Sequence, residues 1–61
     1  MKAKNYIAIE KILNNSYNLI PKENVPELGR FASLITILVD YLKTTNPKFD
    51  QNKFIAGIYK S

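Results

Sequence analysis

Apolar residues recur at spacings of three and four along most of the chain, and two proline-bearing segments interrupt that pattern. The interruptions lie at residues 19–26 and 44–49. Proline donates no backbone hydrogen bond and drives the preceding residue out of helical geometry, so each interruption is expected to end a helix. No segment shows the sustained alternation of a strand. Residues 1–61 are therefore predicted to form a single all-α domain of three helices, the third of them short.

The first predicted helix covers about residues 4–17. Its apolar positions are Tyr6, Ile9, Leu13 and Tyr17, with Ile12 beside them. This spacing places them on one face of an amphipathic helix, while lysine and asparagine occupy the remainder. The helix is therefore expected to pack through that one face.

The second predicted helix has the strongest apolar pattern in the chain. Its stripe consists of Leu28, Phe31, Ile35, Leu38 and Leu42. Just before the stripe, Asn24 and Glu27 have the spacing of a capping pair, and Pro26 suits the first turn of a helix. Ser33, Thr36, Asp40 and Lys43 gather on the opposite side.

The third predicted helix begins with a specific signature. Asp50 suits the N-cap, because its carboxylate accepts hydrogen bonds from free amides of the first turn. Phe49 then precedes the cap, and Phe54 is the fourth helical residue. These two positions form a hydrophobic staple, and Ile55 and Ile58 complete a short apolar face.

The second helix carries more apolar surface than a single contact needs. Ala32 and Val39 widen the stripe on one side, and Leu34, Ile37 and Tyr41 form a second ladder on the other, so the apolar arc covers roughly 220° at about 100° per residue. A typical buried stripe is about 100° wide. Either the other helices cover both ladders, or Leu34, Ile37 and Tyr41 stay exposed and contact a protein partner or a second copy of the chain.

The composition argues against an enzyme. The chain has no cysteine and no histidine, and no Ser-x-x-Lys pattern offers a lysine base to a serine. Its five carboxylates are scattered, no spacing suits a metal ion, and the two glycines lie too far apart for a phosphate loop. We therefore expect no catalytic residues, no metal and no cofactor.

The net charge of +4 is mild and identifies no partner. The most apolar run, residues 31–39, is far shorter than the ~20 residues of a membrane span. No stretch near the start resembles a targeting signal. We expect a cytoplasmic protein that does not insert into a membrane.

A DNA-binding alternative rests on the start of the third helix. The second helix, the Asn46-Pro47 turn and the third helix would then form a helix-turn-helix. Gln51, Asn52 and Lys53 would lie in the turn of the reading helix that contacts base edges. The turn lacks its usual glycine, and positive charge is spread over all segments, which favours a solvated helix start instead.

The C-terminal half resembles a loose class of short, largely uncharacterised phage and prophage proteins. The resemblance rests on residues 38–42, on Asn46-Pro47-Lys48-Phe49-Asp50 and on residues 53–56. Members share an Asn-Pro-x-Phe-Asp-x-x-x-Phe pattern after an apolar helix. The resemblance implies either a protein that blocks or redirects a host protein, or one that binds DNA.

Taken together, these patterns favour a non-catalytic protein-binding module with Leu34, Ile37 and Tyr41 as its contact surface. The partner is expected to be a host or defence protein, which the chain would inhibit, or a second copy in a homodimer. A small helix-turn-helix-like DNA-binding protein is the alternative.

Overall fold

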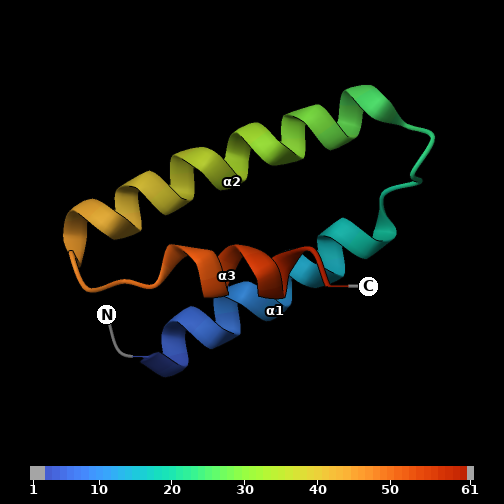
Figure 1. The fold of residues 1–61 in the computed structure, drawn as a ribbon. Coiled ribbons are helices and arrows are strands. Elements are labelled where there is room, and N and C mark those ends of the chain that lie inside the picture. Colours follow the sequence, from blue (N-terminus) through green and yellow to red (C-terminus); the bar gives the residue numbers. More distant parts are fainter. Residues whose placement is uncertain (1–2, 61) are drawn as a thin grey trace.

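The computed structural model describes residues 3–60, which form three helices joined by two short loops (Figure 1). α1 spans Ala3–Leu19, α2 spans Val25–Thr45 and α3 spans Gln51–Ile58. No strand occurs among these residues. The predicted all-α fold with a short third helix is thus confirmed, and α1 extends slightly beyond the predicted range of 4–17.

The first loop turns the chain back so that α2 runs antiparallel to α1 (Figure 1). It begins where Pro21 makes helical geometry unfavourable for Ile20. Asn24 then caps α2, because its side-chain oxygen accepts a hydrogen bond from the Glu27 amide at 3.3 Å. The predicted cap is therefore present, with Pro26 in the first turn.

The second loop is tightened by Asn46. Its backbone N–H donates to the Leu42 carbonyl at 2.9 Å, which ends α2. Its own carbonyl accepts from the Phe49 amide at 2.9 Å, and its side-chain oxygen accepts from the Lys48 amide at 3.2 Å. These bonds satisfy the loop backbone and reverse the chain direction within a few residues.

The start of α3 has the predicted geometry. The Asp50 carboxylate accepts a hydrogen bond from the Lys53 amide at 3.1 Å, as an N-cap does. Phe49 and Phe54 meet edge to face, with ring centroids 5.1 Å apart. Cap and staple therefore fix the angle at which α3 leaves the loop.

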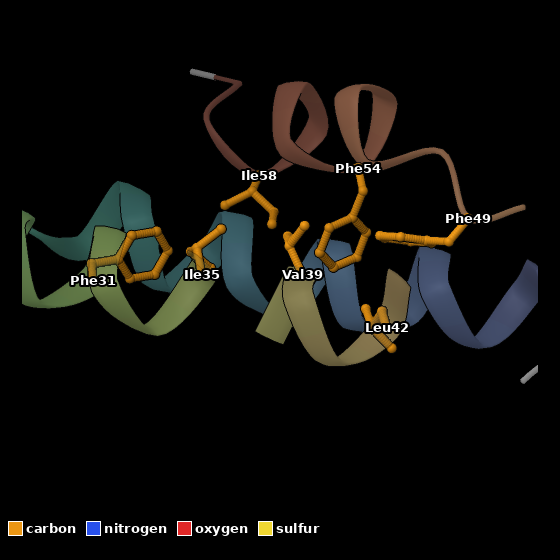
Figure 2. Close-up of a cluster of buried hydrophobic side chains, with 7 residues drawn as sticks. All are labelled: Phe31, Ile35, Val39, Leu42, Phe49, Phe54 and Ile58. Carbon is orange, nitrogen blue, oxygen red and sulfur yellow. The ribbon is translucent and has the colours of Figure 1, made fainter. Parts of the chain in front are cut away.

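The core is a single cluster of seven buried apolar side chains. Figure 2 shows Phe54 and Ile58 of α3 pointing at the buried stripe of α2, with Phe49 filling the space beside Phe54. Half-buried residues of α1 pack against this cluster. The buried residues are Phe31, Ile35, Val39, Leu42, Phe49, Phe54 and Ile58.

α1 contributes no fully buried residue among its described side chains, 4–19. Tyr6, Ile9, Leu13 and Tyr17 lie on its core-facing side, and all four are only half-buried. The predicted packing face is therefore correct, but α2 and α3 cover it incompletely.

The molecule is flat and open for its size. Its principal extents are 35 × 18 × 14 Å, and its radius of gyration is 11.7 Å, whereas a compact chain of this length is expected to have about 10.5 Å. It exposes 4611 Å², against roughly 4,000 Å² expected for a monomer of its mass. About 600 Å² more surface is therefore exposed than a well-packed monomer would expose.

Candidate functional site

The second apolar ladder of α2 is exposed. Leu34, Ile37 and Tyr41 keep 53%, 69% and 63% of their surface accessible. The arrangement in which α1 and α3 flank α2 and cover both of its ladders is therefore not the one the chain adopts. The contact surface expected from the sequence is free, and it lies along the middle of α2.

Helix geometry explains how the exposed ladder relates to the core. At about 100° per residue, Leu34 is rotated about 100° from the buried Ile35, and Tyr41 about 120° in the same direction. Half-buried Leu38 lies between them and the core, at about 60°. Leu38 therefore connects the exposed ladder to the core, so the apolar surface is continuous.

α3 lies on the other side of α2. The Lys43 ammonium donates to the Phe49 carbonyl at 3.3 Å, which ties the loop before α3 to α2. Lys43 is rotated about 80° from Ile35 in the direction opposite to Leu34. Leu34 and Tyr41 are thus directed away from α3, whereas Ile37, about 160° from Ile35, also lines the groove between α2 and α3.

The position of α3 on α1 is fixed by two residues on one side of the α1 core stripe. Asn14 donates from its side-chain amide to the Ile58 carbonyl at 2.9 Å and also to the Lys60 carbonyl. Glu10 lies against Gly57 so closely that a Cβ atom there would overlap its carboxylate. α3 therefore approaches α1 through this side, aided by the absence of a side chain at Gly57.

An exposed residue of α1 lies on the opposite side of that stripe. Ile12 keeps 64% of its surface accessible and is rotated about 100° from Leu13, away from Asn14. It is therefore directed to the side of the core away from α3, as Leu34 and Tyr41 are. We call Ile12, Leu34, Ile37, Leu38 and Tyr41 the α3-free face.

The register between the helices places Ile12 beside the middle of the ladder. Near one end, the Tyr6 hydroxyl accepts a hydrogen bond from Asn46 at 3.1 Å. Near the other, the rings of Tyr17 and Phe31 lie 5.8 Å apart. Ile12 is about midway between Tyr6 and Tyr17, so it is level with the middle of α2.

The exposure of Ile12 was not predicted from the sequence, because Ile12 was grouped with the core residues of the first helix. Its rotation from Leu13 was a signal available in the sequence, because Ile12 falls outside the stripe of Tyr6, Ile9, Leu13 and Tyr17. No periodic pattern indicates which side α3 covers.

A groove of about 510 Å³ lies between α2 and α3, on the side of α2 that faces α3. Ile35, Val39 and Ile55 give it an apolar floor, and Asp40 and Lys43 place opposite charges on its rim. No charged residue occurs between Arg30 and Asp40 on α2. Ile37 also lines this groove, so the groove borders the exposed ladder.

The candidate DNA-contacting residues Gln51, Asn52 and Lys53 are all exposed in the first turn of α3. Lys53 lines a small hollow together with the carboxylates of Glu10 and Asp50. α3 runs back alongside α2 in Figure 1, whereas the helices of a helix-turn-helix cross at about 90–120°. Local charge and helix direction therefore favour a solvated helix start.

Residues 3–60 contain no group of three or more side chains placed to hold a metal ion. None of the three helices described has the length and hydrophobicity needed to cross a membrane. The α3-free face is thus the most prominent candidate site in this part of the chain.

Comparisons with protein-family models, with curated proteins and with solved structures find no match to this chain.

Proposed function

We propose that this chain is a non-catalytic protein-binding module that docks through its α3-free face. The observation that carries the proposal is the exposure of Leu34, Ile37 and Tyr41 on a stretch of α2 without charged side chains. Contiguous apolar surface on a small protein typically marks an interaction site. Tyrosine also suits such a surface, since its ring is apolar and its hydroxyl tolerates water.

The incomplete burial of α1 supports the proposal independently. A partner helix packed against the α3-free face would cover Ile12 and Leu38 along with the exposed ladder. It would also reduce the exposure of half-buried Ile9. Docking would thus complete a core that α3 closes from one side, and burial of apolar area would drive the association.

The narrower proposal is that the partner is a host or defence protein that the chain inhibits. Its support is the resemblance of residues 38–56 to short phage proteins. The geometry of the face favours a helical partner and does not indicate which protein carries it. Shape and lack of charge suit an apolar stripe on another helix, which is a common mode of peptide and protein recognition.

The test is photo-crosslinking in cells that express the chain. Benzoylphenylalanine is placed at position 37 on the α3-free face or, as a control, at position 11. Lys11 is exposed and is rotated about 160° from Leu13, so it is directed away from the core and about 100° from Ile12 of the face. We expect a discrete adduct from position 37 and none from position 11. Equal adducts from both positions, or none from position 37, would overturn the proposal.

A further inference from the structure

We draw no further inference here: the strongest candidate, the exposed apolar ladder along the middle of α2 with the groove between α2 and α3 beside it, is an unpartnered face, and nothing in the structure shows what covers it.

Discussion

The Asn14 side-chain amide donates to the main-chain carbonyl of Ile58 at 2.9 Å, which joins the middle of α1 to the last residue of α3. This carbonyl lies at a helix end, where no intrahelical donor is available. The bond holds α3 on one side of α1. It therefore helps to decide which face of the α1–α2 pair stays open.

Replacing Asn14 with alanine should reduce the free energy of unfolding by about 1–2 kcal/mol, since a partly buried carbonyl loses its donor. Asn18→Ala is the control, because its bond to the Lys60 carbonyl is longer, at 3.3 Å, and exposed. Urea unfolding should show the larger loss for Asn14→Ala. Equal midpoints for the two variants would mean that this bond does not hold α3 in place.

Loss of the α3 cap should lower the free energy of unfolding less than loss of the staple. Asp50→Ala should cost about 1 kcal/mol through the lost cap. Phe54 is only 3% exposed, so Phe54→Ala should cost about 3 kcal/mol or more. A domain of this size has on the order of 5 kcal/mol in total, so the second variant should be partly unfolded.

Denaturant unfolding of both variants beside the parent measures these differences. Any binding should be lost with Phe54→Ala, because the α3-free face depends on the same packing. A midpoint unchanged by Phe54→Ala together with lost binding would make Phe54 a contact residue and contradict its place in the core.

Aspartate should affect the stability of the monomer very differently at Ile35 and at Ile37 of α2. Ile37→Asp should change the free energy of unfolding of the monomer by no more than about 0.5 kcal/mol, as expected for a surface change. Ile35→Asp should unfold the chain, because it places a carboxylate at a site that is 2% exposed. Circular dichroism at low concentration, where a dimer would dissociate, makes the comparison. Unfolding by Ile37→Asp would show that the ladder belongs to the core.

Binding to duplex DNA should be weak and should not depend on the start of α3. The net charge of +4 gives at most a salt-sensitive, sequence-independent attraction. Lys53→Glu should therefore weaken a gel shift no more than Lys11→Glu does. Steeply salt-dependent binding that Lys53→Glu abolishes and Lys11→Glu leaves intact would instead support the DNA-binding alternative.

Much of the fold could be predicted because local signals and tertiary packing agree. Prolines marked both loops, Asn24 and Asp50 marked two helix starts, and Phe49 with Phe54 marked the staple. Each signal depends on residues close together in the chain, so it can be recognised from the sequence alone.

The side on which α3 packs could not be predicted. α2 has two apolar ladders, and the other helices bury only one of them. The choice depends on contacts between residues far apart in the chain, such as Gly57 with Glu10 and Asn14 with Ile58. These contacts produce no periodic pattern in the sequence. The exposure of Leu34, Ile37 and Tyr41 was therefore only one of two alternatives that the sequence allowed.

The most direct test is a crosslinking scan along α2, with benzoylphenylalanine placed in turn at each exposed position from 29 to 44. The adduct yield is expected to follow the helical repeat, with maxima at positions 34, 37 and 41 and minima at positions 29, 36 and 40. This pattern is expected whether the partner is a second copy or another protein. A flat profile, or maxima at positions 36, 40 and 43 beside the α2–α3 groove, would contradict the assignment of the α3-free face as the docking surface.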